Sequence, residues 1–321
     1  TEETALMVTE SNEIGYFEFD NVPAGNFLVR EIASPEAFVL TEEIFPVEIT
    51  EDGQTIEITI ENQIIKGTAE TIKVDADYPD HKLSGAVFEV YADVDNNGEF
   101  NADIDKLAGE MTETEPGLYQ MKDLVYRNYF LHEKEAPEFF EKDDGYYPFS
   151  ITENEAIVRI ETEAGEGFLN KAQTGSLKVV KTADDDKVEG RTFKISGTDF
   201  MGNAYEQEFK TDENGEINLT LRVGEYTVSE VAGEDSEKYI LPDDQTVEIK
   251  AGETTTVKMH NKLVPEVPSV PQTGDNPWMP AILGTLAGLA VLSGGALLFL
   301  RYTGKKRKSA DQADEDQGTE E

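Results

Sequence analysis

Short runs of alternating apolar and polar residues, punctuated by Gly, Asn, Asp and Pro, make up the chain from residue 1 to residue 262. Side chains two positions apart share one face of a strand, so this alternation predicts strands that bury one face. In TDENGEINLTLRVGEYTVSEV, residues 211–231, turns at Asn214-Gly215 and at Gly224 separate two such strands. No 3.6-residue period is sustained before residue 279. The sequence therefore predicts an all-β fold of antiparallel sandwiches.

One unit recurs along this region. GTAETIKVD at 67–75 and GSLKVVKTA at 175–183 each open a unit, and NFLVRE, NYFLHE and EYTVSE each end on a glutamate. Each unit closes on an asparagine, in TIEN, GFLN and KMHN. The repetition predicts three modules, at residues 1–66, 67–173 and 174–262. No lysine precedes Lys66, so we expect the opening strand of the first module upstream of Thr1.

The composition excludes several classes of function. The chain has 67 acidic and 27 basic residues, a net charge of −40, which repels nucleic acid and anionic lipid. It contains no cysteine, which excludes disulfides and thiolate catalysis. The three histidines are scattered, and no Ser/His/Asp or phosphate-loop pattern is present. We therefore expect a protein that is not an enzyme and needs no cofactor, with calcium as the one ion to consider.

A long uncharged apolar segment follows the modules. Its 22 residues, 279–300, would span about 33 Å as a helix, enough to cross a bilayer core of about 30 Å. The alternative is a buried core helix, but the basic RYTGKKRKS that follows is typical of the cytoplasmic flank of a span. The sequence predicts a transmembrane helix at 279–302 and a charged cytoplasmic tail at 303–321.

Residues 263–278 form a proline-rich segment in which Pro265, Pro268 and Pro271 recur every third position, as in an extended polyproline II spacer. Four features in this order resemble the cell-wall sorting signal of Gram-positive surface proteins: the proline-rich spacer, the Thr-Gly dipeptide, the apolar span and the basic cluster that follows it. The resemblance implies that a sortase cuts between Thr273 and Gly274 and joins the chain to peptidoglycan. The implied motif is Val270, Pro271, Gln272, Thr273 and Gly274.

Strand parity places three polar residue types on apolar faces. Glu230 shares its face with Tyr226 and Val228, and Lys181 shares its face with Leu177 and Val179. Asn261 likewise shares its face with Val257 and Met259. Burying such groups unpaired costs several kcal/mol, so their inward position needs a compensating reason. The simplest is a peripheral Lys–Glu salt bridge with an asparagine at a strand end.

The repeats and the sequences YFLHEKEAP and GEYTVSE resemble the Cna-B or SpaA-like domains of Gram-positive adhesins and pilins. This resemblance covers nearly all of residues 1–262 and implies Ig-like sandwiches in which lysine and asparagine condense into an intramolecular isopeptide bond, with a glutamate as proton shuttle. In the second module it implies Lys73, Asn170 and Glu133, although Ile72 and Val74 give Lys73 the wrong parity unless a bulge intervenes. The remaining implied residues are Lys181, Asn261 and Glu230 in the third module, and Glu31 and Asn62 in the first.

The segment DVDNNGEFNADID resembles a calcium-binding loop around Gly98. Ile104 occupies the twelfth position, where an EF-hand requires a bidentate glutamate, so the sequence does not predict a true EF-hand. The two remaining interpretations are a calcium-stabilised hairpin and an ordinary solvated turn. The candidate ligands are Asp93, Asp95, Asn97, Asn101 and Asp103.

Together these features predict the stalk of an adhesin or minor pilin in the Gram-positive cell wall, inserted in the membrane before a sortase cuts it. Its expected partners are a sortase, peptidoglycan, and a host or surface ligand bound by a region upstream of Thr1. One alternative is a stalk that displays an enzyme encoded upstream. Another is a polymerising backbone pilin, which would require a donor lysine in a pilin motif.

Overall fold

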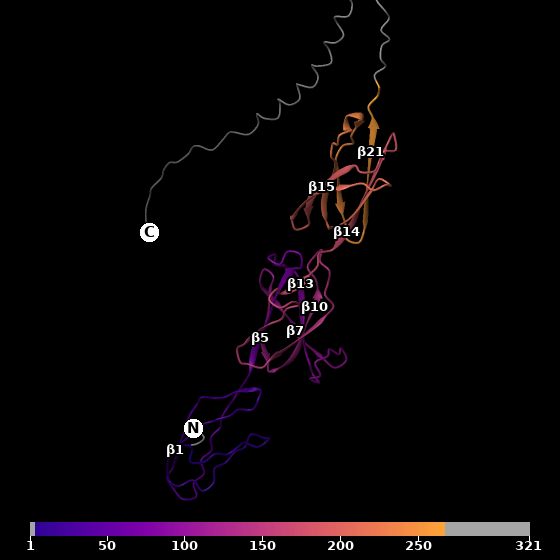
Figure 1. Cartoon of the computed structure of the whole chain (residues 1–321). Helices are drawn as coiled ribbons and strands as arrows, with labels where there is room; N and C mark the ends of the chain where they lie inside the picture. The colour runs from indigo at the N-terminus through magenta and orange to yellow at the C-terminus, as the bar shows by residue number, and fades with distance from the viewer. Residues whose placement is uncertain (1–3, 267–321) are drawn as a thin grey trace, which may run out of the picture. The chain divides into compact units, whose positions relative to one another are not determined.

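The computed structural model describes residues 4–266. These residues are almost entirely β-strand, turn and loop, as the alternation predicted, and nearly all belong to one compact unit that ends at Val264 (Figure 1). Within residues 4–266, no helix reaches the length and hydrophobicity that a membrane crossing requires. Most of the predicted spacer, and the whole of the sorting motif, the span and the tail, lie outside the described residues.

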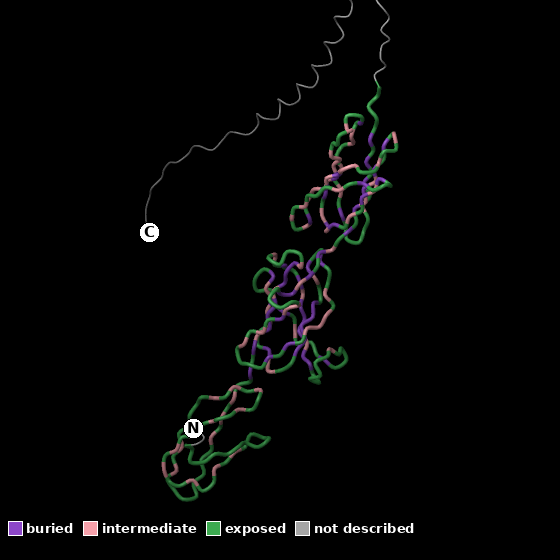
Figure 2. The backbone as a smooth tube through the Cα atoms, viewed as in Figure 1, coloured by how far each residue is buried: buried purple, intermediate pink, exposed green. Residues whose placement is uncertain are grey.

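The strands fall into three groups along the chain, termed modules 1, 2 and 3. Module 1 has four short strands: β1 (Gly25–Val29), β2 (Phe38–Val39), β3 (Phe45–Ile49) and β4 (Gln63–Ile64). They form two two-stranded sheets, β1-β3 and β2-β4. No residue from 4 to 64 is buried, in contrast to the other two modules (Figure 2). The described residues of module 1 thus form strands without enclosing a core.

Module 2 is a sandwich of two sheets, β11-β10-β6-β7 and β12-β5-β9-β8, with β13 added to β5. Its core lies between the sheets and contains Phe88, Tyr119, Leu131 and Phe168, all at most 1% exposed. Its strands are β5 (Lys66–Asp75), β6 (Val87–Ala92), β7 (Lys106–Glu110), β8 (Thr112–Glu115), β9 (Leu118–Val125), β10 (Arg127–Glu135), β11 (Tyr146–Ile151), β12 (Ile157–Arg159) and β13 (Phe168–Asn170).

Module 3 repeats this plan with the sheets β17-β14-β21-β19 and β16-β15-β18-β20. Its core includes Leu177, Val179, Phe193, Val228 and Met259, none of which is exposed. Its elements are β14 (Thr174–Ala183), β15 (Thr192–Asp199), β16 (Ala204–Lys210), β17 (Glu216–Arg222), β18 (Gly224–Glu230), the short 3₁₀ helix η2 (Ser236–Lys238), β19 (Tyr239–Ile240), β20 (Gln245–Ile249) and β21 (Thr254–Leu263).

The predicted turn at Asn214-Gly215 lies directly before β17, and Gly215 has a φ of +76°, a conformation that favours glycine. Most strand pairs are antiparallel, as predicted. The parallel pairs are the exception: β5 pairs in parallel with β12 and with β13, the last strand of module 2, and β14 pairs in parallel with β21, the last strand of module 3. The prediction of antiparallel sandwiches did not include these parallel pairs, since local alternation carries no information about which distant strands pair.

A buried ionic cluster joins residues of modules 2 and 3. The guanidinium of Arg222 lies 2.5 Å from Asp75 Oδ2 and 2.9 Å from Asp199 Oδ2. Asp75 is fully buried and Asp199 is 6% exposed, so both carboxylates depend on this arginine for charge compensation. The rings of Phe140 and Phe200 pack beside it with centroids 5.3 Å apart.

Candidate isopeptide sites

In module 3 the parallel pairing of the first and last strands brings lysine and asparagine together. Lys181 on β14 is opposite Met259 on β21, and Asn261 is opposite Ala183. Because residues two apart on a strand share a face, Lys181 and Asn261 point to the same side of the sheet. Glu230 reaches them from β18 in the facing sheet. Glu230 Oε2 lies 3.3 Å from Lys181 Nζ, and Glu230 Oε1 accepts a 2.7 Å hydrogen bond from Asn261 Nδ2.

Module 2 has the same arrangement. Lys73 on β5 is opposite Phe168 on β13, and Asn170 is two residues beyond that partner, the same offset as in module 3. Glu133 comes from β10 in the other sheet. Its Oε1 lies 3.1 Å from Lys73 Nζ, and both its oxygens accept 2.9 Å hydrogen bonds from Asn170 Nδ2. The backbone N–H of Asp143 donates a further 2.8 Å bond to Glu133 Oε2 and fixes the carboxylate.

The parity problem at Lys73 is resolved by its neighbours on β5. Ala69, Thr71 and Lys73 are all fully buried and point to the core, whereas Ile72 is only partly buried on the other face. The one register shift between β5 and β9 lies at Gly67/Ala69, before the lysine. No bulge at Lys73 is therefore needed. Strand parity gave the wrong direction for Lys73 because its inward neighbours Ala69 and Thr71 are small or polar, whereas the apolar Ile72 lies on the outer face.

Burial shifts both lysines toward the neutral amine. The side chains of Lys73 and Lys181 are 0% exposed. Desolvation lowers the pKa of Lys73 to about 8, against the opposing attraction of Glu133. The pKa of Lys181 is lowered for the same reason, partly offset by Glu230. Aromatic rings complete the lysine site of module 2, since Lys73 Nζ lies 4.4 Å from the centroid of Phe168 and 5.9 Å from that of Phe88.

Several polar atoms of these sites have no hydrogen-bond partner. Asn170 Oδ1 and Asn261 Oδ1 are buried and unpartnered, and Lys73 Nζ makes no aligned hydrogen bond despite its contact with Glu133. Unsatisfied buried groups normally cost about 1–3 kcal/mol each. The asparagine oxygens carry this cost at equivalent positions in two modules, which a peripheral salt bridge would not explain, whereas Lys181 Nζ donates a 2.9 Å hydrogen bond to the carbonyl oxygen of Thr182. The geometry instead brings an amine, a carboxyl group and a carboxamide within contact distance in a dry interior.

An aromatic residue opposite each glutamate was missed by sequence reasoning. Phe88 on β6 is directly opposite Glu133, and Phe193 on β15 is directly opposite Glu230. Both phenylalanines are fully buried and separate the glutamate from solvent on its own sheet. The sequence does contain a signal for these phenylalanines, because VFEVYA and TFKISG occupy equivalent places in the two units and each has phenylalanine at its second position.

Module 1 contains only part of this site. Asn62 Nδ2 donates a 2.7 Å hydrogen bond to Glu31 Oε1, as in the other modules. Asn62 Oδ1 is buried and unpartnered. Among the described residues, no lysine forms an ion pair with Glu31. The expectation of a lysine-bearing strand upstream of Thr1 stays a prediction.

The loop between β6 and β7 brings together a different carboxylate set from the one predicted. One oxygen each from Asp93, Asp95 and Asp105 lie within 4.8 Å of one another, and Asp103 is not part of this group. Asn97 Nδ2 instead donates to Asp95 Oδ2, and Asn101 Oδ1 accepts the backbone N–H of Asp103. Asp105 lies one position beyond the EF-hand template, so the template missed it.

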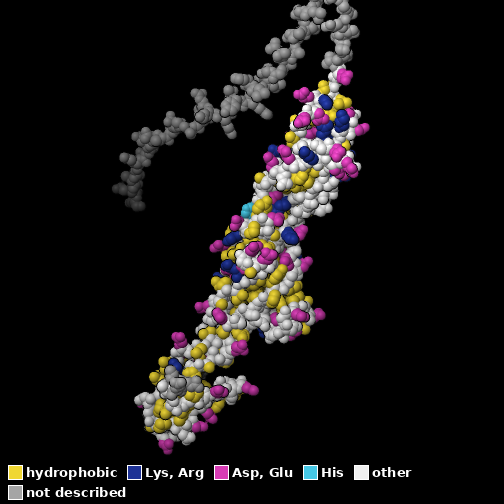
Figure 3. Space-filling model, in the orientation of Figure 1, with side chains coloured by type: hydrophobic (Ala, Val, Ile, Leu, Met, Phe, Trp, Pro, Cys, Tyr) yellow, Lys and Arg dark blue, Asp and Glu magenta, His cyan; other side chains and the backbone are white. Residues whose placement is uncertain are grey.

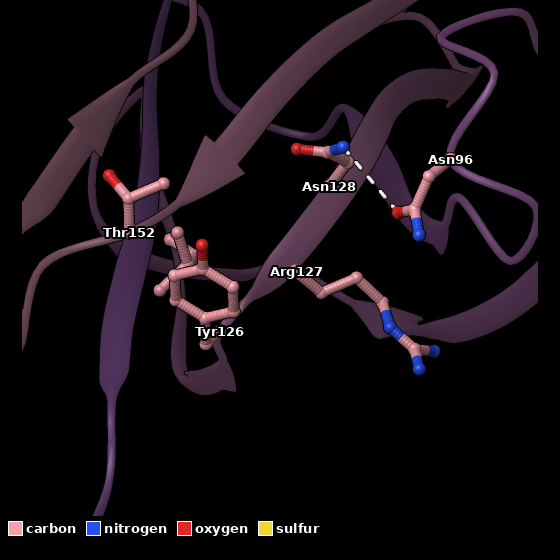
Figure 4. A pocket seen from close by; sticks show the side chains of 6 residues that line it. Asn96, Tyr126, Arg127, Asn128 and Thr152 are labelled. Carbon is pink, nitrogen blue, oxygen red and sulfur yellow. Dashed lines mark hydrogen bonds between the residues drawn. The ribbon is translucent and has the colours of Figure 1, made fainter. Parts of the chain in front are cut away.

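A small hollow of about 200 Å³ lies on module 2 near the turn between β9 and β10 (Figure 4). Its lining mixes polar and apolar side chains, and Asn128 Nδ2 donates to Asn96 Oδ1 across 3.5 Å. Arg127 is the one charged side chain in its lining, so it offers no acid–base pair for catalysis. The hollow is lined by Asn96, Tyr126, Arg127, Asn128, Ile151 and Thr152.

Comparison with known proteins identifies one family. The model of the SpaA prealbumin-like fold domain matches residues 2–64, 67–166 and 175–263. No curated protein matches the chain. Among solved structures, the Bacillus anthracis TIE protein is 25% identical with a TM-score of 0.59. The match covers 79% of this chain and 45% of the TIE chain, so this chain spans less than half the length of that relative.

Two further structures are more distant. The minor pilin GBS52 of Streptococcus agalactiae is 18% identical, with 64% of this chain and 99% of GBS52 covered and a TM-score of 0.27. The C-terminal fragment of the pilus adhesin SpaC from Lactobacillus rhamnosus GG is 13% identical, with 64% of this chain and 100% of the fragment covered and a TM-score of 0.36.

Proposed function

This chain belongs to the family of SpaA prealbumin-like fold domains, and from that premise we propose that it is a structural stalk of a Gram-positive surface adhesin or minor pilin. In the proposal, modules 2 and 3 are each closed by an intramolecular Lys–Asn isopeptide bond. The observation that carries it is the buried Lys–Glu–Asn contact, repeated at the same strand register in two consecutive modules.

The proposed reaction in module 2 uses three groups already in contact. The neutral amine of Lys73 attacks Cγ of Asn170, a C–N bond forms, and the Asn170 C–Nδ2 bond breaks. Glu133 takes a proton from Nζ and delivers it to Nδ2, which leaves as ammonia. The products are one amide bond and one ammonia molecule, and Glu133 is regenerated.

Two features of the site favour this reaction. Burial lowers the pKa of Lys73 to about 8, so the nucleophilic amine is accessible near neutral pH. Glu133 contacts both reacting nitrogens, with Oε1 3.1 Å from Lys73 Nζ and both oxygens 2.9 Å from Asn170 Nδ2, so one side chain can move the proton between them. Lys181, Glu230 and Asn261 have the same roles in module 3.

The mechanical role follows from where the bonds would lie. Each would join the first strand of a module to its last strand, so a pulling force would pass through the bond and leave both sheets folded. Closing a loop of about 100 residues also removes roughly 4–5 kcal/mol of unfolded-state entropy. A stalk exposed to shear and proteases benefits from both effects.

The intact mass of the 321-residue chain tests the proposal. We expect it to be lower than the sequence mass by two molecules of ammonia. Glu230→Gln and Glu133→Gln should each restore one, because the proton shuttle of one module is then lost. Glu225→Gln is the matched control, since Glu225 lies on the same strand as Glu230 but is exposed.

Peptide mapping locates the bonds. The tryptic peptide of Lys181 should be joined to that of Asn261, and the peptide of Lys73 to that of Asn170. An intact mass equal to the sequence mass would refute self-crosslinking and leave ordinary sandwiches with buried ion pairs.

The same proposal extends to anchoring by a sortase that cuts between Thr273 and Gly274 and transfers the chain to peptidoglycan. Its support is the sequence of residues 263–308, since all of this segment beyond residue 266 lies outside the described residues. In a Gram-positive host, the native chain should be released by wall-digesting enzymes only, and Thr273→Ala should make it extractable by detergent. Detergent extraction of the native chain would overturn the anchoring proposal without affecting the isopeptide proposal.

A further inference from the structure

The connection between β6 and β7 holds a group of carboxylates that the proposed stalk chemistry does not use. Asp93 directly follows β6, Asp105 directly precedes β7, and Asp95 lies beside them. One oxygen from each lies within 4.8 Å of the others. Since β6 and β7 pair antiparallel up to Ala92 and Lys106, the group gathers where the two strands meet the loop.

Two of these carboxylates are buried and have no basic side chain paired with them. Asp93 is 1% exposed and Asp105 is 4% exposed. Among residues 4–266, no lysine, arginine or histidine forms an ion pair with Asp93, Asp95 or Asp105. Buried like charges at this distance repel one another strongly unless an opposite charge lies between them.

One oxygen of the buried Asp93 carboxylate has no hydrogen-bond partner. Asp93 Oδ2 accepts the backbone N–H of Gly98, 3.0 Å away, which turns this carboxylate into the loop. Asp93 Oδ1 is buried and accepts no hydrogen bond. Both oxygens of Asp105 accept backbone N–H groups, from Val94 and Asn101, and these bonds fix its carboxylate in the same loop. An unpartnered, desolvated carboxylate oxygen of this kind requires a cation or a proton.

The loop is held in place independently of any ion. The ring of Phe100 stacks on Tyr146 with centroids 3.6 Å apart, and it makes edge contacts with Tyr91 and Phe130. These residues lie on β11, β6 and β10, so the middle of the loop packs against its own sheet. The carboxylates are therefore preorganised, which lowers the entropy cost of binding an ion.

From these observations we infer that Asp93, Asp95 and Asp105 form a calcium site that fastens the ends of β6 and β7. The donors are all oxygen, which suits a hard divalent cation. Calcium fits better than magnesium, because it accepts irregular sets of six to eight oxygens, including backbone carbonyls and water, and magnesium requires near-ideal octahedral geometry. Asp95 is exposed and leaves a path for the ion. The chain as a whole is acidic, with a net charge of −40, and Figure 3 shows Asp and Glu side chains spread over the visible face of the molecule.

Calorimetric titration of the 321-residue chain with calcium chloride, after removal of metals by a chelator, tests the site. We expect one binding event, weakened at least tenfold by Asp93→Asn and by Asp105→Asn. Asp103→Asn is the matched control, because it removes the same charge from the same loop outside the group and should change the dissociation constant less than twofold. A flat titration, or equal weakening by Asp103→Asn and Asp105→Asn, would overturn the site in favour of diffuse binding to an acidic surface.

Limited proteolysis gives a second readout that does not depend on calorimetry. Lys106 is exposed at the start of β7, next to the proposed ion. Calcium should slow tryptic cleavage after Lys106 in the native chain and in Asp103→Asn, but not in Asp105→Asn. Intact mass would show whether each variant still loses ammonia in module 2, which separates a lost ion site from a misfolded module. Equal cleavage rates with and without calcium in the native chain would refute the proposal.

Discussion

At the scale of single residues, the candidate sites depend on charges that folding removes from water. Lys73 and Glu133 are both 0% exposed, and each contacts the other before any bond is made. Burying such a pair is not by itself stabilising, because desolvation can exceed the Coulombic gain. The lowered pKa of Lys73 shows that desolvation exceeds the attraction of Glu133 here. The site therefore favours the neutral amine that the proposed reaction consumes.

The pKa of Lys73 predicts a pH-dependent stability in a chain that cannot react. In Asn170→Ala the lysine stays free, with a folded pKa of about 8 against about 10.4 when unfolded. Between these values the unfolded state binds more protons, so the free energy of unfolding should rise with pH, by about 2 kcal/mol from pH 8 to about pH 9.5. Urea unfolding measures this rise. The double variant Lys73→Met/Asn170→Ala should lack it, and a rise in that control would assign the effect to other groups.

At the scale of elements, the candidate sites depend on close approach between strands. Gly197 on β15 is opposite Tyr226 on β18, four residues before Glu230 on that strand. A Cβ at Gly197 would lie 2.1 Å from the carbonyl oxygen of Glu225 and 2.7 Å from Cα of Tyr226. Both obstacles are backbone atoms, so they cannot rotate away. β15 and β18 can pack in this register only because this residue has no side chain.

Gly197→Ala should therefore destabilise module 3 by about 1–3 kcal/mol, the usual cost of overpacking. The comparison is best made in the Glu230→Gln background, where no covalent bond would hold the module together. Gly233→Ala is the control, because the nearest atom to its added Cβ is Ser236 Oγ at 4.0 Å. Urea unfolding should show a lower midpoint for Gly197→Ala but not for Gly233→Ala. Equal midpoints would mean that β15 and β18 move apart without cost.

At the scale of the whole molecule, modules 2 and 3 connect their first and last strands in the same way. Parallel pairing places the terminal strands side by side, with lysine and asparagine at the same offset in both modules. Force applied to the chain ends enters each module through these two strands. A bond between them would remove the enclosed residues from the extensible length of the chain.

Single-molecule pulling on the 321-residue chain measures this length. The native chain should show no unfolding step from the segments enclosed by Lys73–Asn170 and Lys181–Asn261. Glu230→Gln should add one step of roughly 290 Å, because about 80 residues lie between Lys181 and Asn261 and each extends about 3.6 Å. Glu225→Gln should behave as the native chain does. A full-length step for module 3 in the native chain would show that its termini are not linked.

The sequence by itself determined the local features of this protein. Period-two alternation predicted the strands and the inward position of Lys181, Glu230 and Asn261, because strand parity depends only on residues close together in the chain. Tertiary structure alone decided the parallel pairing of first and last strands and the inward position of Lys73. It also decided that Phe88 lies opposite Glu133 and that Asp105 joins Asp93. Most of these features depend on contacts between residues that are distant in the chain, so neither alternation nor a motif template could predict them. The inward position of Lys73 was missed because its buried neighbours on β5 are polar or small.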